Sequence, residues 1–247
     1  MGPDLTGLSV TVLGCSGSYP GPENAASGYL VRSGRTNVWM DAGPGTLANL
    51  QTHIGLRDVD AVIISHHHPD HWSDLEGFFV ACRYVIERGG IPIYAPRGLE
   101  ELLRVGPTTS PTFEWRDITD GNTVTIGGMT FTFSRTDHIY ETLAVRVDQG
   151  GRSLGYSADT GPGWSLEALG PGLHVALCES TFLQDREGTY PHLSAGQAGA
   201  TAKAAGVERL LAVDGRPQVG QQQALADASV TFGGPVELAA VNQTYPV

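Results

Sequence analysis

The segment SHHHPDHWSDL, residues 65–75, concentrates side chains that bind metal ions. Four histidines and an aspartate follow the apolar run VDAVIIS, and imidazole and carboxylate groups are the usual ligands of zinc, manganese and iron. Residues two apart in an extended segment face the same way, so His66 and His68 are expected to point together and His67 away. Asp70 and His71 follow in the next turn and are expected to face a second position. A solvated polar loop is the alternative, but the density of histidines favours a metal site.

The spacing His-x-His-x-Asp-His resembles the signature of the metallo-β-lactamase superfamily, and matching segments extend over nearly the whole chain. VWMDAGPGTLANL places Asp41 at the end of an early strand, SRTDHIYETLAVRV supplies His138, and GYSADTGP supplies Asp159. CESTF and PHLSAGQAGATAKAAG resemble the ribonuclease Z-like branch. The opening TVLGCSGSYPGPENAASGYLV is more similar to short actinobacterial members that resemble atypical cyclic-nucleotide phosphodiesterases.

The resemblance implies two divalent metal ions, zinc in the first place, with manganese or iron as alternatives, especially at the second position. The implied ligands are His66, His68 and His138 at metal 1, Asp70 and His71 at metal 2, and Asp159 as the bridge. Two such ions, about 3.5–4 Å apart, clamp a phosphoryl group and acidify the water between them. The resemblance also places Asp70 where it orients the resulting hydroxide or takes its proton.

A second pair of residues is implied to act on the leaving group. His192, in PHLS, resembles the histidine that protonates the leaving oxygen in this branch, and Glu179 is placed to orient its imidazole. A helix start capped by Ser194 is the alternative for the same segment. Asp41 is expected to support the ligands rather than bind metal.

The segment LLAVDGRP, residues 210–217, departs from the pattern of the branch. A histidine normally completes metal 2 here, but the position holds Asp214. Asp214 either binds metal 2 through oxygen, or pairs with Arg216 and leaves metal 2 weak or absent, or contacts the substrate. We favour the first reading, in which an oxygen-rich second site leans toward manganese or iron. Arg216 would then restore positive charge for an anionic substrate, although a surface salt bridge is its alternative.

The elements that must position these residues repeat one order in both halves of the chain. Strands are predicted at 8–14, 28–34, 36–43, 59–66 and 91–96 with helices at 45–55, 74–90 and 99–106, and then strands at 122–138, 141–159, 174–181, 209–214 and 235–241 with helices at 194–206 and 221–233. Each half runs from antiparallel strands into strand–helix alternation. We therefore expect an α/β fold, an αββα sandwich of two mixed sheets with helices outside, as one domain over 1–247. Loops 15–27 and 106–122, rich in Gly, Pro, Ser and Thr, are expected to shape the pocket mouth.

Charge and spacing argue against a nucleic-acid partner. The 15 basic and 26 acidic residues give a net charge of −11, whereas binding to a phosphate backbone needs a dense basic surface. Ribonuclease Z proper carries a tRNA-gripping arm between its third-motif histidine and bridging aspartate. Here His138 and Asp159 are 21 positions apart, which leaves room for a strand–turn–strand and none for an arm. We therefore expect a small-molecule substrate.

The remaining composition predicts a cytoplasmic protein. The three cysteines, Cys15, Cys82 and Cys178, are odd in number and widely spaced, as is typical of reduced thiols. No apolar run approaches the 18 residues of a membrane span, and the N-terminus lacks the basic region of a signal peptide. Members of the family often form homodimers, although no apolar stripe in this sequence predicts one.

The function expected from these features is metal-dependent hydrolysis. The first hypothesis is a phosphodiesterase that acts on a small (cyclic) nucleotide through a metal-bound hydroxide. Hydrolysis of a lactone, a thioester or a β-lactam is the alternative, because the superfamily hosts both chemistries and the fold does not decide between them. A non-hydrolytic biosynthetic or ligand-binding role with an altered second metal site is the third hypothesis.

Overall fold

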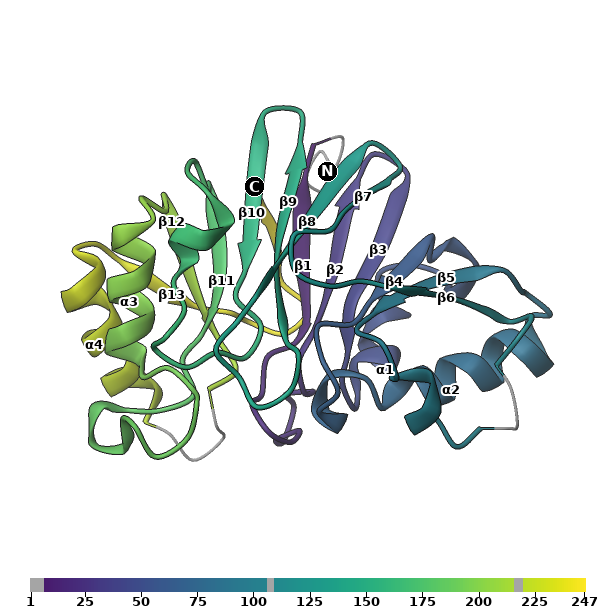
Figure 1. Ribbon diagram of the computed structural model, residues 1–247, viewed down its shortest axis with the longest axis horizontal. Coiled ribbons are helices and arrows are strands. Elements are labelled where there is room, and N and C mark those ends of the chain that lie inside the picture. The colour runs from purple at the N-terminus through teal and green to yellow at the C-terminus, as the bar shows by residue number, and fades with distance from the viewer. Residues whose placement is uncertain (1–6, 106–108, 216–219) are drawn as a thin grey trace.

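Two β-sheets packed face to face, with helices on both outer surfaces, make up the computed structural model, which describes residues 7–105, 109–215 and 220–247 (Figure 1). The first sheet has the order β14 (Thr244–Pro246), β1 (Ser9–Gly14), β2 (Gly28–Ser33), β3 (Thr36–Ala42), β4 (Ala61–Ile63), β5 (Ile91–Ala95) and β6 (Phe113–Asp117). The second has the order β13 (Val236–Leu238), β12 (Arg209–Val213), β11 (Val175–Glu179), β10 (Arg152–Tyr156), β9 (Leu143–Gln149), β8 (Met129–Arg135) and β7 (Thr123–Ile126). The predicted αββα sandwich is confirmed.

Both sheets change from antiparallel to parallel pairing at one strand. In the first sheet β1, β2 and β3 pair antiparallel and β3 to β6 pair parallel. In the second sheet β7 to β10 pair antiparallel and β10 to β13 pair parallel. Parallel strands need crossover connections, and helices in these crossovers cover the outer faces. They are α1 (Thr46–Leu50) and α2 (Asp74–Val80) on the first sheet, and α3 (Ala195–Ala204) and α4 (Gln221–Phe232) on the second (Figure 1).

Alternating side chains of the strands fill three apolar layers. On β3, Met40 points into the central layer between the sheets, where Phe131 of β8 also lies. The adjacent Trp39 points to the other face and packs edge-on against Phe78 of α2, with ring centroids 5.5 Å apart. The third layer lies between the second sheet and α3 and α4. Because successive residues of a strand face opposite sides, one short strand serves two of these layers.

Several elements differ from the prediction. The helix expected at 99–106 is a single 3-10 turn, Glu100–Leu102, because the chain becomes extended at Leu103 and the backbone N–H of Arg104 donates to the Glu76 carboxylate at 2.8 Å. Strand β6 lies within the expected loop 106–122, of which residues 106–108 lie outside the described residues, and β14 follows the strand that was expected to close the chain. Helix α2 continues into a π-helical turn, Ala81–Val85.

The loops that follow the carboxyl ends of β3, β4, β10, β11 and β12 emerge along one edge of the sandwich, the lower edge in Figure 1. The 136–142 loop between β8 and β9 reaches the same edge. Most of the polar side chains singled out in the sequence lie in these loops. Within residues 7–105, 109–215 and 220–247, no helix has both the length and the apolar character that crossing a membrane requires.

Candidate metal centre

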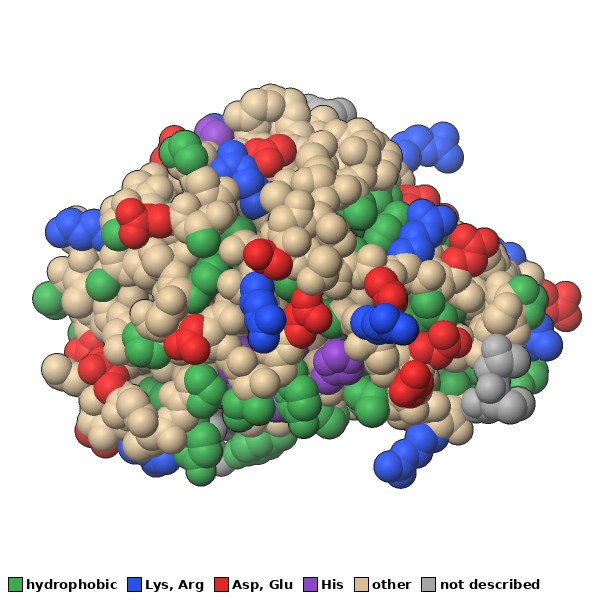
Figure 2. Space-filling view, viewed as in Figure 1, with side chains coloured by type: hydrophobic (Ala, Val, Ile, Leu, Met, Phe, Trp, Pro, Cys, Tyr) green, Lys and Arg blue, Asp and Glu red, His purple; other side chains and the backbone are tan. Residues whose placement is uncertain are grey.

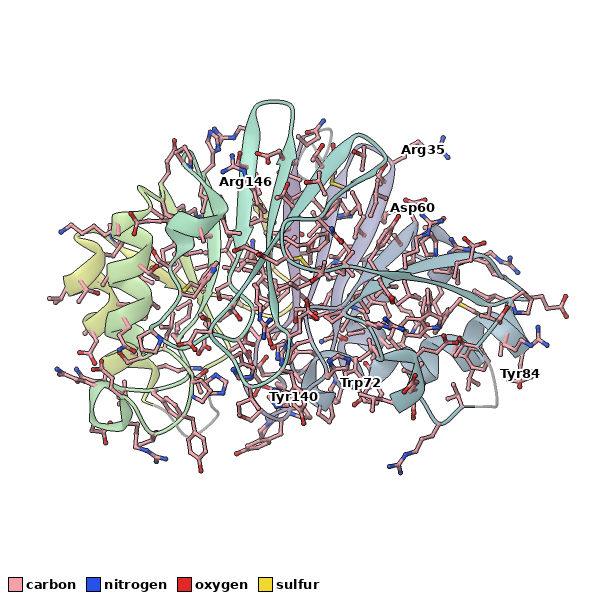
Figure 3. The ribbon with its side chains drawn as sticks, in the orientation of Figure 1. Arg35, Asp60, Trp72, Tyr84, Tyr140 and Arg146 are labelled. Atoms are coloured by element: carbon pink, nitrogen blue, oxygen red, sulfur yellow. The ribbon has the colours of Figure 1, made fainter. Side chains whose placement is uncertain are left out.

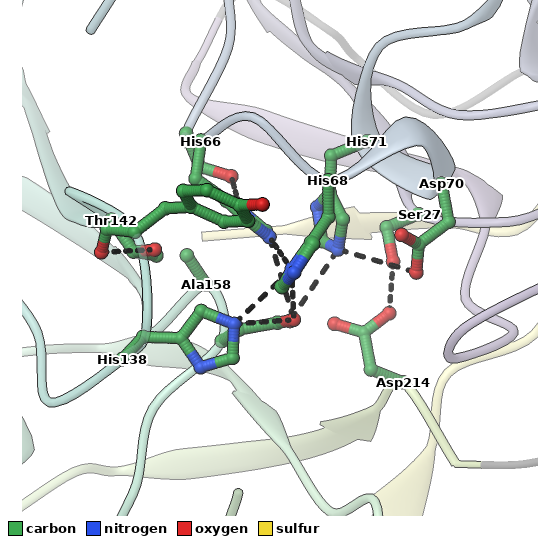
Figure 4. A network of polar contacts seen from close by, with 12 residues as sticks. Ser27, His66, His68, Asp70, His71, His138, Thr142, Ala158 and Asp214 are labelled. Carbon is green, nitrogen blue, oxygen red and sulfur yellow. Dashed lines mark hydrogen bonds and ion pairs between the residues drawn. The ribbon is translucent and has the colours of Figure 1, made fainter. Parts of the chain in front are cut away.

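Side chains from both sheets converge at this edge (Figure 4). The loop after β4 contributes His66, His68, Asp70 and His71, and the loops of the second sheet contribute His138 and Asp214. Asp159, which follows β10, joins them. One ligand atom each of His66, His68, His138 and Asp159 lies within 4.8 Å of the other three. The structure therefore brings together residues that are up to 93 positions apart in the sequence.

The first group of ligand atoms has the spacing of a metal coordination shell. His68 Nδ1 lies 3.0 Å from His66 Nε2 and 3.2 Å from His138 Nε2. Asp159 Oδ2 lies 3.5 Å from His66 Nε2 and 3.6 Å from His138 Nε2. Four ligands arranged tetrahedrally at 2.0–2.1 Å from a zinc ion lie about 3.3 Å from one another. These residues therefore fit a divalent metal ion both in chemical type and in spacing.

Hydrogen bonds outside the cluster hold the protons of two of these histidines away from it. The Ser65 hydroxyl donates to Asp41 Oδ2 at 2.8 Å, so at 2.9 Å it accepts from His66 Nδ1. The carbonyl of Pro191 accepts from His138 Nδ1 at 3.1 Å. Both imidazoles thus present an Nε2 lone pair to the cluster, as a metal ligand must. Burial, together with the neighbouring His71, lowers the pKa of His66 to about 4, which keeps that ring neutral.

Asp159 faces two groups of ligands at once. Its Oδ2 belongs to the first group, and its Oδ1 lies 3.4 Å from Nε2 of His71, which is also 3.7 Å from Asp70 Oδ2. Burial alone would raise the pKa of Asp159, but His71 and His66 outweigh it and hold this pKa well below its ordinary value. Asp159 is therefore ionised, and each of its oxygens is directed at a different position.

A buried carboxylate, Asp41, holds His71 in place. Asp41 Oδ2 accepts from His71 Nδ1 and from the Tyr156 hydroxyl, each at 2.7 Å, in addition to the Ser65 hydroxyl. Its Oδ1 accepts from the Ser65 backbone N–H at 2.7 Å. The proton on His71 Nδ1 is thus fixed, and Nε2 faces Asp70 and Asp159. Burial alone would lower the pKa of His71, but without a metal ion Asp159, Asp70 and Asp41 outweigh it and raise this pKa well above its ordinary value. A bound cation would therefore take the place of the proton on Nε2. Asp41 lies behind the ligands, as the sequence predicts.

Asp214 lies directly after β12 and has one oxygen to spare. Its side chain is buried, and Oδ1 accepts a hydrogen bond from the Ser27 hydroxyl. Oδ2 has no hydrogen-bond partner in the part of the chain that the structure describes. Figure 4 shows the carboxylates of Asp214 and Asp70 directed at the same space beside His71. A buried, unpaired carboxylate oxygen is costly unless a cation or a proton occupies the space beside it.

The electrostatics of Asp214 agree with this geometry. Burial raises its pKa to about 7, and the nearby Asp159 and Glu179 add to the shift against the opposing effect of His71. The alternative pairing with Arg216 falls on a residue outside the described ones.

Two glycines let the neighbouring loops close on the backbone of this site. A Cβ on Gly43 would lie 1.9 Å from the Asp70 carbonyl oxygen, and one on Gly17 would lie 2.2 Å from the Asp214 carbonyl oxygen. Any larger residue at either position would push the loop that carries the carboxylate. Gly17 belongs to the 15–27 loop, which therefore packs against the Asp214 segment and supplies Ser27 to it.

Three residues at the site have left-handed backbone conformations that are unusual for residues other than glycine. They are Asp41 (φ 55°), Ala158 (φ 50°) and Asp214 (φ 56°). Each follows or ends a strand that delivers a group to the cluster. Such conformations persist where surrounding structure determines them, and they gather at functional sites.

Glu179 and His192 form a second polar unit. Glu179 is fully buried at the end of β11, and its Oε1 contacts His192 Nδ1 at 3.0 Å. The same carboxylate accepts from the backbone N–H groups of Thr160 (2.7 Å) and Leu193 (3.2 Å) and from the Thr181 hydroxyl (2.6 Å). Because these donors fix both oxygens, the orientation of the imidazole is fixed as well.

His192 lies beside the metal-binding cluster. Its ring centroid is 5.0 Å from that of His138, and one ligand atom each of Asp159, Glu179 and His192 lies within 4.8 Å of the other two. Ser194 also caps helix α3 through a capping box with Gln197. The helix-cap reading of PHLS thus coexists with a position of His192 at the site.

Sequence reasoning missed three residues of this network. Ser65 directly precedes the first histidine of the motif, and Ser27 ends a Gly/Ser/Pro/Asn-rich loop, so each has a weak local signal. Tyr156, in the buried strand β10, carries none. Their roles depend on contacts between residues 24 to 187 positions apart.

Comparisons with protein families, curated proteins and solved structures all match this chain to proteins of the beta-lactamase superfamily or to ribonuclease Z. A family described as beta-lactamase superfamily domain matches residues 36–213. An uncharacterized protein of Mycobacterium tuberculosis is 35% identical over 98% of this chain and 93% of its own length, and Ribonuclease Z of Mycobacterium bovis is 27% identical over 94% and 95%. The crystal structure of the metallo-beta-lactamase fold protein YhfI from Bacillus subtilis superimposes with a TM-score of 0.88 at 27% identity, covering 96% of this chain and 99% of that one.

Proposed function

This chain belongs to the beta-lactamase superfamily, and we propose that it is a metal-dependent phosphodiesterase that acts on small nucleotides, cyclic nucleotides included. The observation that carries the proposal is the convergence of His66, His68, His138 and Asp159 with the spacing of a coordination shell. The hydrogen bonds that turn imidazole protons away from this cluster support it.

We assign two groups of ligands. His66, His68 and His138 would hold one ion, His71, Asp70 and Asp214 would hold another, and Asp159 would serve both. Bound divalent cations supply two effects, since they lower the pKa of a water and draw negative charge from a phosphoryl oxygen. Three imidazoles at the first position favour zinc, whereas three carboxylates and one imidazole at the second favour manganese or iron.

The protein's own groups would handle the protons. Asp70 is more exposed than Asp159 and Asp214, and it would accept a proton from the attacking water. His192, held by Glu179, would donate a proton to the leaving alkoxide oxygen, and the buried carboxylate would stabilise the ring in its charged form. A simple alkoxide is a poor leaving group without such a proton, so this pair suits a phosphodiester of a sugar hydroxyl.

Several features support a small phosphodiester over other substrates. A relative that covers 94% of this chain is named a ribonuclease, which implies chemistry at a phosphodiester. In this chain the hairpin of β9 and β10 fills the interval between His138 and Asp159, and the net charge is −11, so a long RNA is a poor fit. The three cysteines are free and buried, and on that ground we assign the protein to the reducing cytoplasm.

The direct test measures metal content and substrate class together. Protein purified without added metal should contain two ions per chain and should hydrolyse bis-p-nitrophenyl phosphate in preference to p-nitrophenyl acetate and a chromogenic β-lactam. His66→Ala should lose metal and activity together. His53→Ala is the matched control, because its Nε2 contacts Asn242 Oδ1 (3.0 Å) outside the cluster. One ion or none, or preference for the ester or the β-lactam, would refute the proposal.

A further inference from the structure

The loops on either side of the metal-binding cluster expose apolar side chains. Ile139 is 68% exposed, Tyr140 47% and Tyr190 57%. They make up three of the nine large hydrophobic side chains exposed in the described part of the chain. All three come from two loops, residues 136–142 and 180–194. Exposed apolar groups gathered at a polar site are a feature of ligand-binding surfaces.

These side chains lie at the rim of the cluster. The Tyr140 ring packs edge-on against the His68 ring, with centroids 4.9 Å apart. The contact of His138 Nδ1 with the Pro191 carbonyl, at 3.1 Å, ties the 136–142 loop to the 180–194 loop. Tyr140 follows His138 by two positions and Tyr190 directly precedes Pro191, so both tyrosines border this junction. Figure 3 places Tyr140 at the lower edge of the molecule, and Figure 2 shows hydrophobic side chains along that edge.

Three charged groups of the same loops have partners other than the metal-binding cluster. Asp137 Oδ2 accepts from the Gly163 backbone N–H at 2.9 Å, and Glu141 accepts from the Thr119 hydroxyl. The Arg186 guanidinium lies 5.7 Å from the centre of the Phe182 ring. Among the described residues, the rim beside His68 therefore offers aromatic and aliphatic surface rather than a cation for a second phosphate.

We propose that Tyr140, Tyr190 and Ile139 form a subsite that stacks the base of a nucleotide whose phosphoryl group lies at the metal centre. The inference rests on the proposed phosphodiesterase function and specifies its substrate class, a mononucleotide with an accessible base. Aromatic side chains stack on any base through its π-face, so the subsite favours nucleotides over phosphodiesters that lack a base and discriminates weakly among bases.

Binding measurements on the metal-loaded protein test the subsite without requiring turnover. Calorimetric titration with adenosine 5′-monophosphate and with inorganic phosphate should separate the base from the phosphoryl group. Tyr140→Ala and Tyr190→Ala should each raise the Kd of the nucleotide roughly tenfold and leave the Kd of phosphate unchanged. Tyr140→Phe should retain the affinity of the unmodified protein. Tyr84→Ala is the matched control, because Tyr84 is exposed at the far right of Figure 3, away from the site.

Three results would overturn the subsite. One is no change in nucleotide affinity in either alanine variant. Another is equal loss of nucleotide and phosphate binding with the metal retained, which would make Tyr140 a support for His68. The third is a change in sedimentation alone, which would make the rim a contact between protein chains. If the protein hydrolyses phosphodiesters while these variants bind the nucleotide normally, the proposed function stands and the subsite fails. If the alanine variants lose nucleotide affinity as expected but the protein hydrolyses no phosphodiester, the subsite stands and the proposed function fails.

Discussion

Replacing Asp214 with asparagine should have opposite effects on the metal-free and the metal-loaded protein. The amide matches the carboxylate in shape, tolerates the left-handed backbone at this position, and can still accept from the Ser27 hydroxyl. The substitution therefore removes a negative charge and changes little else.

The magnitude in the metal-free protein follows from the pKa of Asp214, which burial raises from 3.8 to about 7. Because the folded pKa is raised, the folded protein holds a proton that the unfolded chain releases at lower pH. The stability contributed by that proton is complete below pH 3.8 and is lost as the pH rises through about 7. A shift of about three units corresponds to roughly 4 kcal/mol at pH 8. Asp214→Asn should recover most of this at pH 8 and roughly a third of it at pH 5, where the folded carboxyl keeps its proton and the unfolded one has largely lost it.

Thermal unfolding of chelator-treated protein at the two pH values measures this difference. At roughly 2–4 °C per kcal/mol for a chain of this size, the variant should melt about 8–15 °C above the unmodified protein at pH 8, less the cost of burying the amide. With manganese or zinc added at pH 8 the order should invert, because the carboxylate gains a cation and the amide does not. Asp185→Asn, at an exposed position, is the control. Equal melting of the metal-free proteins at pH 8, or an unchanged order with metal, would refute the role assigned to Asp214.

Three further substitutions test other parts of the site. Asp41→Asn should leave His71 without its carboxylate acceptor and weaken metal at the second position by about 10–100-fold, as measured by competition with a chelator, with a smaller loss at the first position, which Asp41 reaches only through Ser65. Gly43→Ala should lower the free energy of unfolding by roughly 3 kcal/mol or more in urea titrations, because its Cβ would meet the Asp70 carbonyl oxygen at 1.9 Å; a neutral effect would contradict the loop geometry. His192→Ala should lower kcat on alkyl phosphodiesters by about 10²–10⁴-fold but affect a p-nitrophenyl ester of phosphate far less, since nitrophenolate leaves without a proton; an equal loss on both substrates would argue against a general acid.

The fold was largely predictable because its strands carry strong patterns. Continuous apolar runs mark the buried strands β4 and β12, and the repeated order of strands and helices indicates two sheets. Strand β6 was missed because its sequence, FEWRD, is charged at an edge of the sheet, where no face is fully buried. The segment at 99–106 has good helix formers, but burial of Leu103 and the contact of Glu76 with the Arg104 N–H end the turn early.

The site was predictable where its residues are neighbours in sequence. Strand alternation predicts that His66 and His68 point together, and the turn that follows predicts a second position for Asp70 and His71. Assigning His138 and Asp159 to the same site required family resemblance, because no local pattern sets how two sheets meet. The contact of Ser27 with Asp214 spans 187 positions and has no sequence signal. Only the structure therefore shows that one oxygen of this carboxylate is paired and the other is not.

The candidate metal centre lies between the two halves of the chain. The β4 loop of the first sheet and the strand ends of the second contribute ligand atoms to both groups. An ion at the first position would crosslink His68 of the first sheet to His138 of the second, 70 positions apart in the sequence. The apolar central layer does not specify such a closure, because hydrophobic contacts are non-directional. Loading with metal should therefore raise the temperature at which the two sheets unfold, and the size of this shift should report on occupancy of the site.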